Sequence, residues 1–268
     1  MPAEDRLLIL IPTYNEAQNV EPLLNEILAV NLEADILFVN DHSTDGTDEI
    51  LVRLSSMHPR VHLLQRASKQ GIGSAHQAGI NWAYDHRYRR LLTMDADFTH
   101  SPACIPAFLE KAHVFDLVIA SRFLDKDSLP DWTFFRRSLT YLGHFMTVLF
   151  LRMPLDATGA FRLYRLDKLP REIFRLVRSP SYSFFFESLF VIWFNRFSIA
   201  EIPIVLPARI QGHSKMVLSD AIESFRFLIG LFNRRLFERH SLRCPVSNAL
   251  QTDGLFRVAS VGGEKRHR

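Results

Sequence analysis

The sequence contains little cysteine, and its apolar runs are short. Its two cysteines, Cys104 and Cys244, are far apart in the chain and form no CxxC pair. Such usage is typical of a reduced, cytosolic chain and excludes a zinc site or disulfide framework built on cysteine. No stretch reaches the roughly 18–20 apolar residues that a transmembrane helix needs. The longest candidates are residues 142–151 and 184–194, and Glu187 interrupts the second.

The N-terminal apolar run also lacks the features of a signal peptide. No basic region precedes it, and Pro12 breaks it after a few residues. We therefore expect neither a signal peptide nor a transmembrane helix, and a chain that is soluble or peripheral to a membrane.

The excess of one sign of charge over the other is also small. The chain has 32 basic and 29 acidic residues, and its net charge of +3 is too small to indicate a nucleic-acid-binding protein. Hydrophobic residues make up 47% and charged residues 23%, which are ordinary proportions for a globular protein with a sizeable core. A length of 268 residues favours one α/β domain with an appendage.

The first 121 residues show a regular alternation of strand and helix patterns. Short apolar runs predict strands, and residues at helical spacing lie between them; Gly71 and Gly73 predict the turn that opens one such helix. The predicted strands are residues 7–11, 36–39, 61–64, 91–94 and 117–120. This order predicts an α/β fold with a Rossmann-like, mainly parallel sheet and helices on both faces. Ligands of such sheets bind outside the carboxyl ends of the strands, where this sequence places its polar residues.

The pattern is less regular after residue 122. We predict helices over residues 136–151 and 184–194, a strand over 202–206 and an amphipathic helix over 221–239. The apolar stripe of that last helix comprises Phe225, Leu228, Ile229, Phe232 and Leu236, with Arg226, Arg234, Arg235 and Arg239 around it. Such a helix packs on the core or lies at a membrane surface. Residues 240–268 show no pattern and predict a disordered tail.

Two acids follow the fourth predicted strand directly. Asp95 and Asp97 flank Ala96, so both carboxylates can face one cavity, where they would raise each other's pKa without a partner. A divalent cation removes this repulsion, and Mg²⁺ or Mn²⁺ suits such oxygen ligands together with substrate phosphates. The alternative is a solvated loop with two unrelated acids, which the strand context disfavours.

Other polar motifs are weaker when taken one at a time. Residues 12–16, PTYNE, also fit a helix start with Asn15 as N-cap and Glu16 in the first turn. Asp41 follows the second strand, where acids are common in turns. Guanidinium groups bind phosphate oxygens in bidentate fashion, so basic residues in apolar or turn-rich surroundings are candidate phosphate ligands. These are Arg122, Arg136, Arg137, Arg162, Arg209 and Lys215.

Taken together and in order, six motifs resemble the family 2 glycosyltransferases of the GT-A type. They are IPTYNE (11–16), VNDHSTDGT (39–47), MDADFTH (94–100), ASRF (120–123), TGAFRLYR (158–165) and RIQGHSK (209–215). The likeness is closest to the catalytic subunits of dolichol- or polyprenol-phosphate mannosyltransferases. It implies one GT-A domain over residues 1–239, with a nucleotide-binding half to about 122 and an acceptor half from about 123.

The resemblance also implies a role for each matching residue. Base and ribose would be surrounded by Pro12, Tyr14, Glu16, Val39 and Asp41. Metal and donor phosphates would be bound by Asp95, Ala96 and Asp97. Donor diphosphate or acceptor phosphate would be met by Arg122, Arg136, Arg209 and Lys215, with Arg137 as the alternative to Arg136. The expected catalytic residues are Asp95, Asp97 and Arg122.

Three motifs differ from the family pattern. Asn40 replaces the usual Asp, Thr99 replaces a Gln or Ser that often assists the metal, and TGAFR replaces TSGFR. A third protein ligand for the metal is therefore not identified from the sequence.

The resemblance implies inverting transfer of a sugar, with mannose from GDP-mannose as the first expectation, to a polyprenyl or dolichyl phosphate. A phosphate acceptor is an oxyanion near neutral pH because its second pKa is about 6, so it needs positioning more than a general base. His100, the candidate for a catalytic histidine at this site, is expected to support neighbouring site residues or to be structural. The enzyme would use Mg²⁺ or Mn²⁺ and lie peripherally on the cytosolic face of a membrane, with a separate anchoring subunit as one option. The alternatives are a UDP-sugar-dependent transferase with another acceptor and a non-catalytic sugar-nucleotide-binding scaffold subunit.

Overall fold

The computed structural model describes residues 6–130, 132–206, 218–245 and 258–260. The strands are Leu7–Thr13 (β1), Ala34–Asn40 (β2), Val61–Gln65 (β3), Arg90–Thr93 (β4), Leu117–Ser121 (β5), Arg162–Arg165 (β6), Ile199–Pro203 (β7) and Val258–Ser260 (β8). The helices are Val20–Ala29 (α1), Thr47–Met57 (α2), Ile72–Asp85 (α3), Ile105–Lys111 (α4), Phe134–Leu151 (α5), Arg171–Arg175 (α6), Phe184–Phe194 (α7) and Leu218–Phe237 (α8). Two short 3₁₀ helices cover Pro102–Cys104 (η1) and Arg239–Leu242 (η2).

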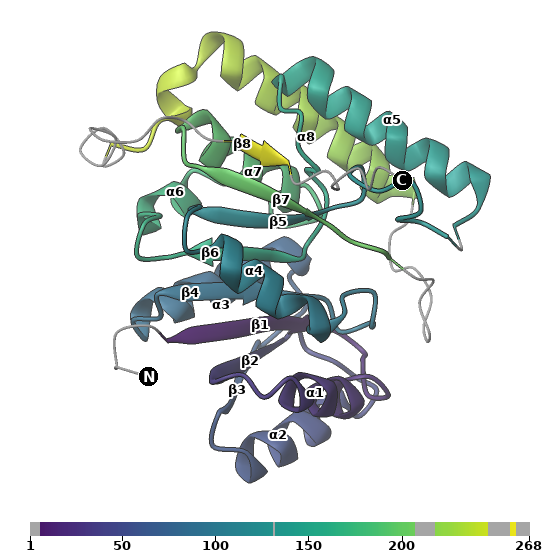
Figure 1. Cartoon of the computed structure of the whole chain (residues 1–268), viewed down its shortest axis with the longest axis vertical. Coiled ribbons are helices and arrows are strands. Elements are labelled where there is room, and N and C mark those ends of the chain that lie inside the picture. The colour runs from purple at the N-terminus through teal and green to yellow at the C-terminus, as the bar shows by residue number, and fades with distance from the viewer. Residues whose placement is uncertain (1–5, 131, 207–217, 246–257, 261–268) are drawn as a thin grey trace, which may run out of the picture.

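Within the described residues the strands form one eight-stranded sheet in the order β3-β2-β1-β4-β6-β5-β7-β8 (Figure 1). All neighbouring pairs are parallel except the two that β6 makes with β4 and β5. The predicted mixed, mainly parallel sheet is confirmed. Because β6 runs in reverse, its first residues lie at the edge where β4 and β5 end, which brings the 158–162 segment beside the acidic turn after β4.

Helices cover both faces of the sheet, as the strand–helix alternation predicts. Side chains alternate along β1: Leu8 and Leu10 pack into a core with α3, α6 and α7. Leu7, Ile9 and Ile11 pack into a second core with α1, α2 and α4. The strand is therefore apolar throughout because both of its faces are buried.

Two glycines place the start of α3 against the loop before α7. Gly71 has a φ of +95°, a conformation that glycine adopts at no steric cost. A Cβ at Gly73 would lie 2.5 Å from the Ser181 carbonyl oxygen and 2.7 Å from the Phe184 Cβ. The predicted turn at these glycines is thus combined with a close approach between two segments of the chain.

Helix α8 is attached to the core through a buried ion pair. Arg234 donates to the Glu187 carboxylate of α7 at 2.7 Å, and both side chains are less than one-tenth exposed. The second carboxylate oxygen of Glu187 accepts the backbone N–H groups of Arg178 and Ser179. Arg234 therefore belongs to the interior and does not flank the apolar stripe at the surface of the helix.

The apolar stripe expected on α8 is divided between the core and solvent. Leu228 is buried and Phe232 packs edge-on against Phe150 of α5, whereas Phe225 and Leu236 are 49% and 44% exposed. No described helix is both long and apolar enough to span a membrane.

The segment expected to be a disordered tail, residues 240–268, contains regular structure where it is described. Leu242 and Cys244 are buried, and Asn195 bonds to the Leu242 carbonyl and the Cys244 N–H. Strand β8 pairs with β7. The expectation therefore does not hold for these residues.

Candidate active site

The carboxyl ends of the central strands lie together at one edge of the sheet. The Asp41 N–H donates to the Thr13 carbonyl at 2.8 Å, which joins the ends of β2 and β1. The Thr93 hydroxyl donates to the Ala160 carbonyl at 2.6 Å, which joins the end of β4 to the segment before β6. Motifs that are far apart in sequence therefore surround one place, as expected for a parallel sheet.

The acidic turn after β4 is held by its own neighbours. One carboxylate oxygen of Asp97, Oδ1, accepts both the N–H of Thr99 at 3.2 Å and its hydroxyl at 2.6 Å. The Asp95 N–H donates to His100 Nδ1 at 2.9 Å. Because Nδ1 accepts this bond, the proton of the neutral ring lies on Nε2. The Asp95 carboxylate is 29% exposed, whereas Asp97 is buried.

The chemistry of this turn fits a small divalent cation. Asp95 and Asp97 offer hard oxygen donors, and Mg²⁺ is commonly held by one or two carboxylates completed by substrate phosphates. Thr99 is oriented by its bond to Asp97 and supports the turn. No group of three or more His, Cys, Asp and Glu side chains arranged for a metal occurs in the described part of the chain.

The loop after β1 is fastened to the loop after β2. The Asn15 N–H donates to the Ser43 hydroxyl, and the Asn15 side-chain oxygen accepts the Thr44 N–H, both at 2.9 Å. Since α1 begins at Val20, Asn15 is not its N-cap, and that alternative for the PTYNE motif is wrong. The ammonium of Lys69 lies 3.9 Å from the ring centre of Tyr14. Lys69 is exposed, so this pair borders the open edge of the sheet.

Asp41 is the centre of a buried cluster. Its carboxylate pairs with Arg66 at 2.7 Å, with side chains 6% and 7% exposed, and accepts the N–H groups of Gln70 and Gly71. Arg66 also donates to Gln70 and Ser74. Asp41 therefore fixes the segment from residue 66 to 71, which carries Lys69.

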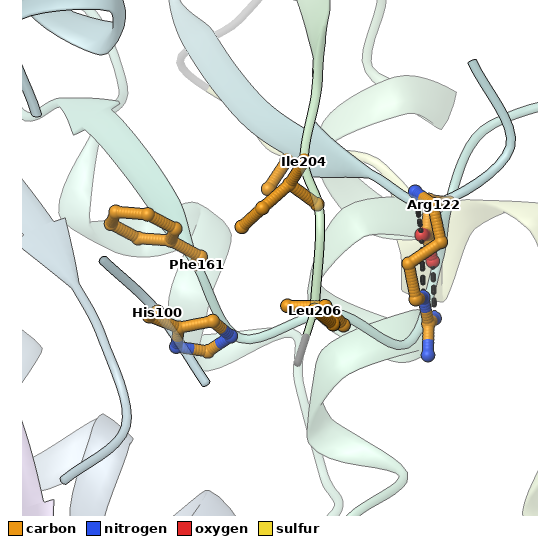
Figure 2. Close-up of a pocket in the computed structure, with 8 residues that line it drawn as sticks. His100, Arg122, Phe161, Ile204 and Leu206 are labelled. Atoms are coloured by element: carbon orange, nitrogen blue, oxygen red, sulfur yellow. Dashed lines mark hydrogen bonds and ion pairs between the residues drawn. The ribbon is translucent and has the colours of Figure 1, made fainter. Parts of the chain in front are cut away.

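Arg122 is likewise bound to a carboxylate of its own chain. Its Nε donates to Asp156 at 2.8 Å, its Nη2 donates to Asp156 and Thr158, and its backbone N–H donates to Asp156 at 2.9 Å (Figure 2). Burial by itself lowers the pKa of Arg122, but the charge and the hydrogen bonds of Asp156 together outweigh burial, and the pKa is raised. Burial raises the pKa of Asp156, and the charge and hydrogen bonds of Arg122 reverse that effect and lower it. The hydrogen bonds of the Arg122 side chain to described residues are made by Nε and Nη2, and Nη1 makes none of them.

A small pocket lies between the acidic turn and this ion pair. Figure 2 shows His100 and Phe161 on one side and Arg122 on the other, with Ile204 and Leu206 between them. The His100 and Phe161 rings are stacked with centres 4.9 Å apart. Phe161 comes from the TGAFR motif, so the pocket joins the acidic turn to the segment expected to meet the acceptor.

The comparisons with known proteins agree with this geometry. A family model described as glycosyl transferase family 2 matches residues 8–176, more than half of the chain. The chain belongs to glycosyl transferase family 2. As a family 2 glycosyltransferase it is an enzyme that transfers sugars.

The undecaprenyl-phosphate mannosyltransferase of Micrococcus luteus is 34% identical over 79% of this chain and 87% of its own length. The polyprenol monophosphomannose synthase of Mycolicibacterium smegmatis is 32% identical over 82% of this chain and 84% of its own length.

Solved structures confirm the GT-A-like fold of this family 2 glycosyltransferase. The glucosyl-3-phosphoglycerate synthase of Mycobacterium tuberculosis, crystallised with Mn²⁺, UDP and glucosyl-3-phosphoglycerate, matches 87% of this chain and 80% of its own, with a TM-score of 0.62. The TarS structure from S. aureus with UDP-GlcNAc matches 88% and 69%, with a TM-score of 0.53. At 16% and 15% identity these likenesses concern the fold alone.

The other residues predicted to contact the donor are either buried or partly exposed. Val39 is buried in β2, Ala96 is buried between the two acids, and Pro12, Tyr14 and Glu16 are partly exposed. Arg137 donates to the backbone carbonyls of Leu129 and Pro130. Arg136 lies in α5, and its side chain is outside the description, as are Arg209 and Lys215 altogether.

Arg162, another candidate phosphate ligand, has a structural position. It is 1% exposed and donates to the Gly159 and Ala157 carbonyls and to the Ser188 hydroxyl. Its guanidinium holds the start of β6 against α7.

Residues that sequence reasoning missed are mostly the partners of predicted ones. Arg66 and Lys69 precede the Gly71-Ile72-Gly73 turn, and Asp156 precedes the TGAFR motif. The sequence signals that could have identified them are two basic residues before a glycine turn and an acid before a motif that contains arginine. Asn40 donates to Asp48 and to Gln65 and accepts from Ser43. An amide suits this position because Asp there would face Asp48 with like charge.

Proposed function

We propose that this family 2 glycosyltransferase moves a sugar from a nucleoside diphosphate to a polyprenyl or dolichyl phosphate, with inversion at the anomeric carbon. Mannose from GDP-mannose is the first donor to test, because the two relatives are named for mannosyl transfer to undecaprenyl phosphate and for polyprenol monophosphomannose synthesis. The observation that carries the proposal is the acidic turn held by His100 and Thr99 at the carboxyl edge of the sheet, beside the Arg122 pocket.

The donor nucleotide is assigned to the edge formed by the loops after β1 and β2. Tyr14 and Glu16 are partly exposed there, and we assign them to direct contact with base and ribose. Pro12, Val39 and Asp41 shape that edge from beneath. Lys69, above the Tyr14 ring, adds a positive charge that suits a nucleotide phosphate.

The donor diphosphate is assigned to the acidic turn. A divalent cation held by Asp95 and Asp97 would supply counter-charge to the departing diphosphate. Arg122 is kept in one orientation by Asp156, so its Nη1 group can meet a phosphate oxygen with little loss of side-chain entropy. We also assign Arg136, Arg209 and Lys215 to donor or acceptor phosphate.

The acceptor needs an entry that positions its phosphate opposite the leaving group. A lipid phosphate is already an oxyanion near pH 7, so the protein orients it and excludes water, and no side chain has to remove a proton. His100 agrees with this view, because its Nδ1 is engaged by the Asp95 N–H and its proton lies on Nε2.

A radiolabelled donor screen tests the proposal. Purified protein with polyprenyl phosphate and Mn²⁺ should transfer label from GDP-mannose, and Asp97→Ala should lower the rate about 100-fold or more because diphosphate counter-charge is lost. Glu110→Ala, an exposed acid on α4, is the control and should keep the wild-type rate.

Other outcomes would change the proposal. Transfer from UDP-sugars and not from GDP-mannose would favour the UDP-dependent alternative. Nucleotide binding without transfer to any acceptor would favour the scaffold subunit. Full activity of Asp97→Ala in EDTA would remove the metal from the reaction.

A further inference from the structure

Helix α5 presents an apolar face to solvent. Five large side chains of one broad face, all hydrophobic, are each about half exposed: Leu139, Tyr141, Leu142, Phe145 and Leu149. Its first residue, Phe134, is 86% exposed. The helix contains no Asp or Glu over its 18 residues. A contiguous exposed apolar face of this kind marks an interaction surface.

The opposite face of α5 is packed, so the exposed face is a fixed feature of the fold. Leu151 and Thr147 are buried, and the Phe150 ring packs edge-on against Phe232 of α8 at 5.2 Å. Arg235 of α8 donates to the Phe150 carbonyl at 2.6 Å, near the end of α5. Figure 1 shows α5 and α8 together at the end of the sheet opposite α1 and α2.

Basic side chains border this apolar face. Arg152 follows α5 one turn after Leu149, and Arg239 follows α8. Burial lowers the pKa of Arg235, and the neighbouring charges of Arg152 and Arg239 lower it further, so the three arginines form one positive cluster. Helix α8 adds exposed apolar side chains at Phe225 and Phe237.

We propose that the exposed face of α5, with the arginine cluster at its end, is the surface by which this enzyme binds an anionic lipid bilayer. Apolar side chains enter the boundary between headgroups and acyl chains, and arginines meet anionic headgroups. A second copy of the chain is disfavoured as the occupant because α5 carries no Asp or Glu that could pair with the arginines of its copy. The choice of a bilayer rests on the lipid acceptor in the proposed function.

One flank of α5 connects this surface to the site. The ring of His144 stacks on Phe123 at 4.0 Å, and Tyr141 lies 5.6 Å from the same ring. Phe123 adjoins Arg122, which lines the pocket. A bilayer under α5 therefore lies next to the pocket that joins the acidic turn to the segment expected to meet the acceptor, and the lipid chain can stay in the membrane.

Vesicle co-sedimentation tests the surface directly. With the purified full chain and vesicles of phosphatidylcholine and phosphatidylglycerol, Phe145→Glu with Leu149→Glu should lower the partition coefficient at least tenfold at an unchanged melting temperature. Val52→Glu with Met57→Glu on α2 is the matched control, because these side chains are 58% and 60% exposed against 58% and 56% for Phe145 and Leu149. Arg152→Glu should weaken binding to these vesicles and not to pure phosphatidylcholine.

Activity separates this inference from the proposed function. The Phe145→Glu, Leu149→Glu variant should transfer sugar to a short, water-soluble prenyl phosphate at the wild-type rate and lose transfer to long-chain polyprenyl phosphate in vesicles. Wild-type protein that binds vesicles but transfers no sugar to either acceptor would overturn the proposed function alone. Equal vesicle binding by variant and wild type would overturn the surface. A concentration-dependent wild-type dimer that the variant abolishes would identify a second copy as the occupant and overturn the bilayer.

Discussion

Asp95 and Asp97 depend on two polar neighbours for their placement. Thr99 bonds to the carboxylate of Asp97, and His100 accepts the N–H of Asp95 while its ring stacks on Phe161. His100 thus links the acidic turn to the TGAFR segment and acts as a positioning residue. Groups that orient metal ligands from behind commonly change metal affinity by about 10–100-fold when mutated.

Two substitutions separate the acceptor nitrogen of His100 from its ring. His100→Phe keeps a ring against Phe161 and removes the acceptor for the Asp95 N–H, so the Mn²⁺ concentration for half-maximal transfer should rise about tenfold. His100→Asn keeps an acceptor near the position of Nδ1 and should retain a lower Mn²⁺ requirement than His100→Phe. Titrations of Mn²⁺ at fixed donor concentration measure both. Identical Mn²⁺ curves for the wild type and His100→Phe would contradict the role.

The segment between β3 and α3 is held in place by the buried ion pair of Asp41 and Arg66. Asp41 binds it through Arg66 and through two backbone N–H groups, and the segment carries Lys69 to the Tyr14 ring. Breaking a buried pair by removing one partner leaves an uncompensated charge, which is more costly than losing an exposed pair.

Arg66→Ala should therefore lower the free energy of unfolding by about 3 kcal/mol and raise the KM for the donor more than it lowers kcat. Chemical denaturation and initial-rate kinetics measure the two effects. Arg53→Ala is the control, because Arg53 pairs with Glu21 on the surface with side chains 46% and 43% exposed, and its loss should leave stability almost unchanged. Equal stability of the two variants would show that the Asp41 cluster does not hold the segment.

Over the whole molecule, the two faces of the sheet have separate cores, and one of them encloses an uncharged histidine. His76 of α3 is fully buried against Phe184 and Phe185, and its ring nitrogens have no hydrogen-bond partner among the described residues. Burial, with a smaller effect of the Arg162 charge, lowers the pKa of His76 to about 3.

Stability should therefore fall in acid because of His76. Between the ordinary histidine pKa of about 6.5 and about 3, the unfolded chain binds a proton that the folded chain does not, so this group destabilises the fold as pH falls. The free energy of unfolding of His76→Leu, relative to wild type, should rise by about 1 kcal/mol per pH unit from pH 6 to 4. Urea denaturation at several pH values measures this slope. His113→Leu, at an exposed site, is the control: its free energy of unfolding relative to wild type should not change with pH over this range. If the relative free energy of His76→Leu were also independent of pH, the account would be refuted.

The sequence by itself determined that the chain forms a mainly parallel sheet with helices on both faces, and that the acidic pair lies at a strand end. Residues 7–11 are apolar because both faces of β1 are covered, and helical spacing of apolar residues marked α1 and α2. These patterns are local in the chain. Asp95 and Asp97 could be placed at the ligand-binding edge because they follow a buried strand directly.

Only the tertiary structure decided which charges are paired inside the protein. Arg122 pairs with Asp156, Asp41 with Arg66, and Glu187 with Arg234, and the partners are 25 to 47 positions apart in sequence. The antiparallel insertion of β6, which brings Ala160 to Thr93, is likewise a long-range pairing. Charge pairing and strand order depend on contacts that chain periodicity does not encode. For that reason the sequence could name the charged residues but could not tell ligands from buried partners.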